Sequence, residues 1–528
     1  MWNIVTVLCV VWVLTLLYGE MLVFWLPSLW ACSWPQLHHP PSNYTKMNSE
    51  GSSDYSVRVA VIADPQLMDR TSHGRAPKSL SLEILQFYTD LFIRRSYLLS
   101  IRPLKPDTVL FLGDYFDGGP ILSDEEWQDS LNRFRHVFDL NTRRQHANSP
   151  IHYFISGNHD VDYAISHPHK LKVIERYEKE FGKRNYVFRV GKLDFVSIDA
   201  QDLDGNMQDT LTSTTWEFVK NVSKDGSSNP RVLLTHIPLY RRDKAPCGPH
   251  RTSNIVNQRI VRAPRNLGVL YQNYITEESS RKLLDLIQPV MVLSGHDHDH
   301  CTVTHMTKTG PVVEHTLATI SMQQGNFYPS FMLLSANGAD VQNATDPTSV
   351  VATELCSLPV QLLIYFWYAG LLVVTILILL FWPASGVVFW PRFTDFLSNI
   401  RRQLFGDGTA KEKNEDENCE YEMIWDAEGS MHLVKKAAKP TSTRPDLRDS
   451  VERGGATMRA AAKKHASAAS DVNIDVGSDP PGRQLLKSGK SKTRLVIQRF
   501  IRVLRMLSVI AVVNVPLYMM LLFKDWIN

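Results

Sequence analysis

The sequence predicts an α/β domain at residues 57–340 that is joined to two or three transmembrane helices. Apolar, strand-like runs alternate with helix-like runs between residues 57 and 337, and most of the strand-like runs end in Asp, Asn or His. Such alternation is typical of layered α/β domains, in which ligands bind beyond the strand ends. Three other segments carry one charged residue or none, and each approaches or exceeds the ~20 residues that a membrane-spanning helix needs.

The first apolar segment, residues 4–26, contains Glu20 as its single charged residue. It lacks the basic start of a signal peptide, so we expect an uncleaved membrane anchor at residues 1–27, although a cleaved signal peptide stays open. The second segment, residues 358–382, has no charged residue at all. Soluble helices of that length show a polar face, so this segment is predicted to be a transmembrane helix.

The third apolar segment, residues 506–523 within a helix expected at residues 504–523, has no charged residue and contains Asn514 and Pro516. It is predicted to be a third transmembrane helix, although a re-entrant or interfacial helix stays open. Residues 483–505 directly before it hold eight Lys or Arg and no acid. Under the positive-inside rule this basic cluster lies in the cytoplasm.

Charge is unevenly distributed along the chain. The whole chain has 57 Lys+Arg against 54 Asp+Glu, a formal charge of +3, whereas residues 383–528 alone hold 23 against 17. The near-neutral total argues against a nucleic-acid-binding protein with a broad basic face. The basic end of the C-terminal part suits anionic membrane lipids, and no protein partner is predicted for it.

Two segments read as linkers. Residues 28–56 are predicted to be a stalk, and residues 383–503 a largely disordered cytoplasmic loop with few large apolar residues. Within the loop, residues 421–434 around Trp425 suit a hairpin, a partner-binding motif or a solvated linker, and we favour the linker. The glycosylation triplets all precede the second apolar segment, which predicts a lumenal α/β domain; they begin at Asn43, Asn221 and Asn343.

The elements of the domain follow from hydrophobic periodicity. The helix predicted at residues 80–100 has Leu80, Ile84, Phe87 and Leu91 on one face. A second helix is predicted at residues 124–139, where acids in the first turn favour the helix dipole. Strands are predicted at residues 57–63, 108–112, 151–155, 231–234 and 290–293.

Five polar clusters follow these strands. Their Asp, Asn and His side chains offer the oxygen and imidazole donors that suit Mn, Fe or Zn, and no thiol is among them. A single cluster of this kind is usually a turn or a structural residue, but five in order predict a metal centre. The clusters are Asp64 with Gln66, Gly113-Asp114 with Asp117, Gly157 to Asp160, Thr235-His236, and Gly295 to His298.

This series of motifs resembles the calcineurin-like metallophosphoesterase superfamily, with its blocks D-x-H, GD-x-x-D, GNH-D/E, H and GH-x-H. The resemblance implies a β-sandwich flanked by helices (αββα), and a phosphoric ester hydrolase with two divalent metal ions, Mn²⁺ first and Zn²⁺ or Fe as alternatives. It implies that Asp64 and His298 hold one metal and that Asn158, His236 and His296 hold the other. Asp114 would bridge both metals.

The resemblance also implies roles for residues around the ligands. His159 would be the general acid or stabilise the transition state, with Asp160 orienting it, and Asp117 would support the ligands without binding metal. Gln66 stands where the family has His; it is expected to be a neutral oxygen ligand that tunes the metal site, and loss of activity is the alternative.

Arg241 and Arg242 follow His236 closely in the sequence. Two interpretations are open for them. They would neutralise the charge of a substrate phosphate, or they are exposed surface cations.

Four strings of the sequence resemble one subgroup, the GPI-remodelling phosphodiesterases. This resemblance implies removal of ethanolamine-phosphate from a mannose of the GPI glycan by a membrane protein of the endoplasmic reticulum, its exit sites or the Golgi, with GPI-anchored proteins as partners. Two alternatives stay open: another phospholipid, nucleotide or phosphoprotein substrate, or a catalytically weak cargo receptor or scaffold. The strings are ADPQL at residue 63, FLGDYFDGG at 111, HIPLYRRD at 236 and LSGHDH at 293.

The predicted lumenal part contains four cysteines, and four cysteines allow three pairings. We favour a disulfide between Cys247 and Cys301, because it would tie the long loop after His236 to the strand that follows His298. The other two cysteines are Cys32 and Cys356.

Overall fold

A computed structural model describes most of the chain outside the stalk and the long C-terminal loop. The described residues are 2–37, 56–72, 79–140, 149–164, 169–227, 229–253, 257–264, 268–324, 326, 328–337, 350–382, 421–425, 431–435 and 492–527. They belong to two compact units, one formed by residues 1–382 with 495–528 and the other by residues 383–494. The triplets at Asn43 and Asn343 lie outside the described residues, and Asn221 is exposed on a helix.

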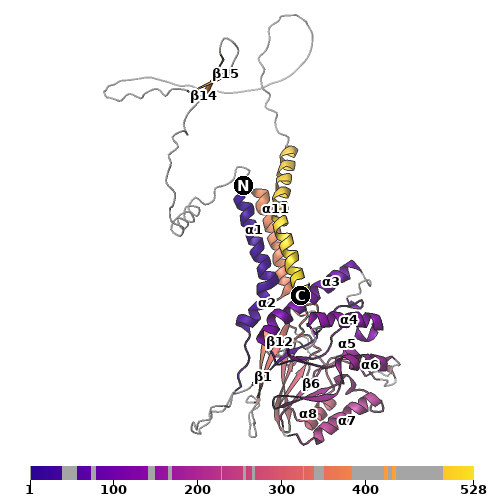
Figure 1. Cartoon of the computed structure of the whole chain (residues 1–528). Helices are drawn as coiled ribbons and strands as arrows, with labels where there is room; N and C mark the ends of the chain where they lie inside the picture. Colours follow the sequence, from indigo (N-terminus) through magenta and orange to yellow (C-terminus); the bar gives the residue numbers. More distant parts are fainter. Residues whose placement is uncertain are drawn as a thin grey trace, which may run out of the picture. The chain divides into compact units, whose positions relative to one another are not determined.

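Two β-sheets form the centre of the α/β domain (Figure 1). In the five-stranded sheet, β1, β2 and β3 are parallel and β12 and β13 are antiparallel additions. Its order is β13 (Val351–Ser357), β12 (Ser330–Asn337), β1 (Ser56–Ile62), β2 (Thr108–Phe111) and β3 (Ile151–Phe154). The order of the six-stranded sheet is β10 (Cys301–Thr307), β11 (Gly310–Thr316), β9 (Met291–Ser294), β6 (Arg231–Thr235), β5 (Leu193–Ile198) and β4 (Tyr186–Val190).

Side chains that alternate along the strands build three apolar layers. Val59 and Val61 of β1 face the second sheet, where they share a buried cluster with Val232 and Leu234 of β6. Their neighbours on β1 point to the opposite face, because successive strand residues alternate. The outer faces of the two sheets are covered by helices, α3 (Leu80–Arg95), α4 (Asp124–Val137) and α6 (Lys170–Phe181) on the first and α7 (Thr210–Lys224) and α8 (Glu277–Ile287) on the second. The predicted αββα sandwich is confirmed.

Local signals explain where the predicted helices begin. Ser123 and Glu126 form a reciprocal capping box at the start of α4. Ser79 accepts a hydrogen bond from Leu82 N and starts α3, which passes after Arg95 into the wider turns of η4 (Ser96–Ile101). Shorter elements are α5 (Asn158–Val161), η5 (Arg102–Leu104), η6 (Gly119–Ile121), η7 (Ala200–Asp202) and the β7–β8 pair (Ile260–Arg262 and Val269–Gln272).

Three helical segments among the described residues are long and apolar enough to cross a membrane. They are Ile4–Ala31, Gln361–Phe381, which is α9, and Val496–Ile527. The first comprises α1 (Trp2–Leu17), η1 (Tyr18–Leu22), α2 (Val23–Leu26) and η2 (Pro27–Ala31). The last belongs to α11 (Lys492–Ile527), one continuous helix of 36 residues that contains Pro516. α11 starts before residue 504 because its Lys and Arg residues are good helix formers.

Two disulfides fasten the domain. The predicted pair Cys247–Cys301 is confirmed, and Cys32 pairs with Cys356. The second bond joins the end of the first membrane segment to β13, immediately before the second membrane segment. Among the described cysteines, Cys9 is free.

In the second unit the structure contains an antiparallel hairpin of β14 (Tyr421–Trp425) and β15 (Met431–Lys435). The solvated linker that we favoured for residues 421–434 is therefore wrong. The two strands carry Tyr, Ile, Trp and Val residues with high strand propensity, which the low-complexity surroundings obscured.

Candidate metal centre

The structure brings all six predicted metal ligands together at the ends of strands from both sheets. Two groups of three side chains have their ligand atoms within 4.8 Å of one another, and Asp114 belongs to both. The first group contains Asp114, His236 and His296, and the second Asp64, Asp114 and His298. Asn158 adjoins the first group, since its Oδ1 lies 3.1 Å from His236 Nε2.

The backbone at these positions adopts conformations that side chains other than glycine rarely take. Five residues of the centre have a positive φ, although none is a glycine. Such conformations cost about 1–3 kcal/mol each and persist where the surrounding structure enforces them, often at functional sites. The residues are Asp64, Gln66, Asp114, His296 and His298, with φ of 50°, 36°, 55°, 69° and 59°.

Two glycines of the motifs allow the carboxylates of two predicted ligands to lie close to the backbone. A Cβ atom at Gly157 would lie 2.1 Å from Asp114 Oδ1, and one at Gly295 would lie 2.9 Å from Asp64 Oδ2. Both distances are shorter than non-bonded atoms tolerate. The glycines of these motifs therefore provide room for the carboxylates as well as sharp turns.

His236 is oriented by the backbone of the first sheet. Its Nδ1 lies 2.7 Å from the carbonyl oxygen of Leu112, which leaves Nε2 facing Asp114 Oδ1 at 3.2 Å. Burial lowers the pKa of His236, but the Asp114 carboxylate outweighs burial and raises the pKa to about 9. A backbone acceptor on one ring nitrogen is the usual support of a metal-binding histidine.

The two remaining histidines are held in the neutral form that a metal ligand requires. His296 Nε2 donates to the carbonyl oxygen of Gln272 at 2.9 Å, so Nδ1 faces the ligand group. Burial lowers the pKa of His296 to about 3 and that of His298 to about 4. A neutral imidazole keeps its lone pair for a cation.

The two carboxylates are buried side by side and compete for positive charge. Burial raises the pKa of Asp64 to about 8, and the neighbouring Asp114 carboxylate adds to that rise. Burial also acts to raise the pKa of Asp114, but His236 and His159 outweigh it and lower this pKa. Two adjacent buried carboxylates are costly without a cation between them, so this arrangement fits a bound metal.

Gln66 offers a further oxygen at the same place. Its Nε2 donates to Asp114 Oδ2 at 2.9 Å, whereas its Oε1 is buried and has no hydrogen-bond partner. An orphaned acceptor beside two ligand groups fits a cation, since buried polar atoms are nearly always satisfied. The structure thus places the Gln66 side chain beside Asp114, and its role as a neutral oxygen ligand stays a prediction.

His159 and Asp160 differ from their predicted relationship. The carboxylate of Asp160 accepts hydrogen bonds from the backbone N–H groups of Asp114, Tyr115 and Gly157 at 2.8–2.9 Å. The His159 ring is held instead by the carbonyl oxygen of Asp117 through Nδ1. Asp160 therefore fixes the backbone that carries Asp114, and the prediction that it orients the His159 ring is wrong.

A comparison with protein families identifies the domain. Residues 57–300 match the calcineurin-like phosphoesterase family, so the match contains every cluster described above. This chain carries a calcineurin-like metallophosphoesterase domain. It is accordingly a metal-dependent phosphoester hydrolase.

Two curated relatives cover most of the chain. Cell division control protein 1 of Saccharomyces cerevisiae is 29% identical over 377 residues, which are 68% of this chain and 70% of the relative. Metallophosphoesterase 1 of Pongo abelii is 28% identical over 380 residues, which are 68% and 85% of the two chains. Among solved structures, 5'-nucleotidase from Candida albicans matches with 9% identity over 57% of this chain and 52% of that chain, with a TM-score of 0.28.

Within the metallophosphoesterase domain, Arg241 is not a surface cation. Its side chain is buried, with Nη2 3.3 Å from Glu314 Oε2 and 2.6 Å from Thr316 Oγ1, and its guanidinium lies over the Tyr274 ring. The positive charge of Arg241 is thereby paired with Glu314. Arg242 is exposed.

Sequence reasoning missed several residues that support the metallophosphoesterase centre. The carbonyl oxygens of Leu112 and Gln272 orient two predicted ligands, and Thr319 Oγ1 donates to the backbone oxygen of Asp64 at 2.6 Å. Backbone acceptors leave no trace in side-chain patterns. Thr319 follows β11 in the same way that the ligands follow their strands, and that position was its only signal.

Proposed function

We propose that this protein is a membrane-anchored phosphodiesterase that removes ethanolamine-phosphate from a mannose of the GPI glycan. The observation that carries the proposal is the combination, within one compact unit, of the ligand cluster, five grouped residues with Asn158 beside them, and three candidate membrane spans. A hydrolase fixed at a membrane suits a substrate that a lipid holds in the same membrane. The strings shared with the GPI-remodelling subgroup support the choice of substrate.

Each residue of the centre has a proposed role. Asp64, Gln66 and His298 would hold one divalent ion, Asn158, His236 and His296 would hold the other, and Asp114 would serve both. Mixed oxygen and imidazole donors without thiolate favour Mn²⁺, with Zn²⁺ or Fe as alternatives. When bound, two such ions supply Lewis-acid stabilisation of the phosphoryl oxygens and lower the pKa of the attacking water.

His159 is the proposed general acid. The Asp117 carbonyl engages Nδ1, so Nε2 is the atom from which a proton passes to the leaving alkoxide. Burial acts to lower the pKa of His159, but the Asp114 carboxylate and the Asp117 carbonyl outweigh burial and raise it. A raised pKa keeps this proton available near neutral pH.

We propose that the domain is lumenal, in the endoplasmic reticulum, its exit sites or the Golgi. β13 leads directly into α9, and Arg94 Nε of the domain donates to the carbonyl oxygen of Asp525 near the end of α11. At the other end of these helices, Arg502 donates to the carbonyl oxygen of Trp382 at 2.5 Å. The domain and Trp382, which follows α9, therefore lie at opposite ends of the helices, which supports the proposed topology.

Mass analysis of GPI glycans tests the proposal directly. In cells that lack the protein, GPI-anchored proteins should retain an additional ethanolamine-phosphate, and wild-type protein should remove it again. The Asp114→Asn variant should fail to rescue, whereas Asp243→Asn, which changes an exposed aspartate outside the cluster, should rescue fully. Unchanged ethanolamine-phosphate in the deficient cells would contradict the proposed substrate.

A further inference from the structure

The apolar stripe of α3 is only partly buried in the domain. Leu91, at its end, is buried, whereas Leu80 is 72% and Ile84 47% exposed. Phe87 lies between them on the same face, because residues three and four apart in a helix are neighbours. The first half of the stripe is therefore open to the surroundings of the domain.

The middle of the stripe contacts the membrane segments. The Phe87 ring lies 5.3 Å from the ring of Trp526, in the last turn of α11. Tyr518 Oη of α11 donates to Tyr88 Oη at 3.2 Å, and the Tyr88 ring lies 6.0 Å from that of Tyr365, near the start of α9. α3 therefore touches the domain-side ends of two membrane helices.

These contact residues mark a level in the bilayer. Tyr and Trp are enriched where membrane helices leave the hydrocarbon core, because their rings are apolar and their tips polar. Trp526, Tyr518 and Tyr365 lie near the domain-side ends of α11 and α9. Leu80 precedes Phe87 by seven residues, about 10 Å along a helix. Figure 1 shows α3 running sideways from the foot of the membrane helices, so its exposed half lies close to the same level.

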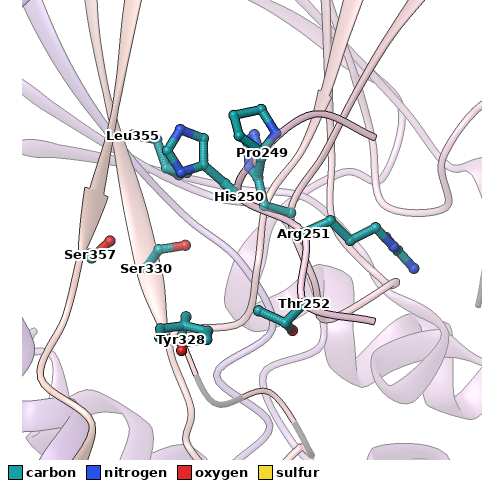
Figure 2. Close-up of a pocket in the computed structure, with 9 residues that line it drawn as sticks. Pro249, His250, Arg251, Thr252, Tyr328, Ser330, Leu355 and Ser357 are labelled. Atoms are coloured by element: carbon teal, nitrogen blue, oxygen red, sulfur yellow. The ribbon is translucent and has the colours of Figure 1, made fainter. Parts of the chain in front are cut away.

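A second exposed ring lies near the foot of α9. Tyr328 is 56% exposed and lines a cleft of about 520 Å³ between the loop of residues 249–252 and the strands β12 and β13 (Figure 2). The next residue, Pro329, accepts a hydrogen bond from Leu358 N at 2.8 Å. Leu358 precedes the first residue of α9 by three positions, at most ~11 Å along an extended chain. Two separate elements thus present apolar or aromatic side chains beside the membrane segments.

Another face of α3 is fastened to the loop that carries Gln66. Gln86 Nε2 of α3 donates to the carbonyl oxygen of Met68 at 2.9 Å. Arg133 of α4 donates to the same oxygen at 2.8 Å and pairs with Asp90 of α3. Met68 follows Gln66 by two residues. The position of α3 therefore sets the position of one loop of the metal centre.

A lipid bilayer suits the exposed stripe better than a soluble partner protein does. Leu80 and Ile84 are bordered by Ser81 and Glu83, both exposed, so polar side chains flank apolar ones. Helices of this kind lie in the plane of the membrane surface, with their apolar side chains about 5–10 Å into the boundary between headgroups and acyl chains. Because α3 contacts the membrane helices of its own chain, lipid would adjoin the stripe in every copy of the protein.

We propose that the first half of α3 is a membrane-docking surface, in which Leu80 and Ile84 insert into the leaflet on the domain side of the bilayer. The inference rests on the membrane anchoring in the proposed function and not on its substrate. Docking gives the domain an attachment to the membrane besides the three helices. Through Met68 it fixes the orientation of the metal centre relative to the lipid surface.

Spin-label accessibility in phosphatidylcholine nanodiscs tests the docking. The labels are placed in full-length protein that carries Cys9→Ser and Cys419→Ser. A nitroxide at Ile84→Cys should be at least about threefold less accessible to water-soluble NiEDDA than one at Glu217→Cys, and more accessible to oxygen. Glu217 is exposed on α7, which covers the other sheet. Leu372→Cys, at a 47% exposed position within α9, reports whether that helix lies in lipid.

A second variant distinguishes lipid from a covering protein. Ile84→Asp should raise the NiEDDA accessibility of a nitroxide at Leu80→Cys about threefold, because a carboxylate is unfavourable in the apolar boundary. The unfolding temperature in detergent should not change, since Ile84 is exposed in the domain.

Three results would overturn the docking. If Ile84→Cys were as accessible to NiEDDA as Glu217→Cys while Leu372→Cys lay in lipid, the docking would be wrong and the anchoring intact. Low accessibility of Ile84→Cys to both NiEDDA and oxygen would mean that protein covers the stripe. A water-accessible Leu372→Cys would contradict the membrane anchoring itself, and the docking with it.

Discussion

The metal centre and the membrane junction of this protein are both clusters of buried charge, yet they are completed in different ways. At the junction, Arg95 of α3 is 1% exposed and binds Glu20 at 2.6 Å and Asp525 at 3.1 Å. Tyr368 of α9 donates to the second oxygen of Glu20 at 2.9 Å. Arg95 thus joins the domain to the first membrane segment and to α11, and Glu20 extends the contact to α9.

At the metal centre, no lysine or arginine among the described residues pairs with the two central carboxylates, and their ion-pair partner is the imidazole of His236. Asp64 and Asp114 are fully buried, their neighbours are imidazoles and amides, and Gln66 Oε1 is left without a partner. The junction satisfies its charges with side chains and is therefore structural, whereas the centre gathers donors that require a cation from solution. Each of the following predictions tests one side of this difference.

The largest effect is expected at the bridging ligand. Asp114→Asn should reduce the turnover of bis(p-nitrophenyl) phosphate with Mn²⁺ by about 10³-fold or more, because both ligand groups lose their shared carboxylate. The unfolding temperature without metal should fall, because His236 and His159 favour the ionised form of Asp114 and lose that partner. Initial rates and thermal unfolding measure the two quantities, with Asp243→Asn as control. Turnover equal to wild type would refute the site.

At the junction, Arg95→Ala should destabilise the protein by about 3–5 kcal/mol, because Glu20 and Asp525 lose their buried partner. Thermal or denaturant unfolding in detergent measures this change. The triple variant Arg95→Met, Glu20→Gln and Asp525→Asn should recover most of the loss.

The control at the junction is Arg102→Ala. The Arg102 side chain is 50% exposed and pairs with Asp139, so its removal should change stability by about 0.5 kcal/mol or less. If Arg95→Ala cost no more than this control, the junction would not act as a buried structural pair.

The Arg241–Glu314 pair lies in the same domain as the metal centre but should behave like the junction. Burial acts to raise the pKa of Glu314, and Arg241 and His305 outweigh it and lower the pKa from 4.5 to about 2. Because the folded-state pKa is depressed, the pair adds stability above about pH 4.5 that is lost as the pH falls toward 2. The full effect is about 3 kcal/mol.

Unfolding measured from pH 7 to pH 3 checks this prediction. Wild-type protein should lose stability below about pH 4.5, and Glu314→Gln should remove that part of the pH dependence. Glu277→Gln, which changes a 58% exposed glutamate paired with Arg281, should keep it. If the stability of Glu314→Gln depended on pH as that of wild type does, groups other than Glu314 would cause the loss of stability below pH 4.5.

The smallest effect is expected at Gln66. Gln66→Ala should weaken Mn²⁺ binding about tenfold, because one neutral oxygen donor is lost and Asp114 loses its amide partner. Gln66→His should shift preference toward Zn²⁺, which favours imidazole. Competition between the two metals, followed by isothermal titration calorimetry, measures both. Identical affinities in all three proteins would place Gln66 outside the donor set.

The sequence predicted the metal centre better than the junction, for a physical reason. Ligands such as Asp64 and Asp114 directly follow apolar strands, so local patterns mark them and the fold brings the strand ends together. Glu20, Arg95 and Asp525 are far apart in the sequence, and no local spacing links them. Glu20 was visible only as an isolated charge in an apolar segment.

Within the domain, the predictions from the sequence were right or wrong for a similar reason. The helix at residues 124–139 was recognisable from its acidic first turn, and α4 begins at Asp124 and ends within two residues of that range. The role of Asp160 was mispredicted because its partners are backbone N–H groups, which every residue has. Patterns of side chains identify donors, but they do not reveal which backbone atoms those donors will meet.

Equilibrium dialysis of the full-length protein against Mn²⁺ tests the central claim most directly, namely that the buried donor cluster needs cations which its own side chains do not supply. Wild-type protein should bind two ions per chain, and Asp114→Asn should lose at least one of them, while Arg95→Ala in its folded fraction should still bind two. Wild-type protein that binds no Mn²⁺, Zn²⁺ or Fe²⁺, or an Asp114→Asn variant that retains both ions, would contradict the account.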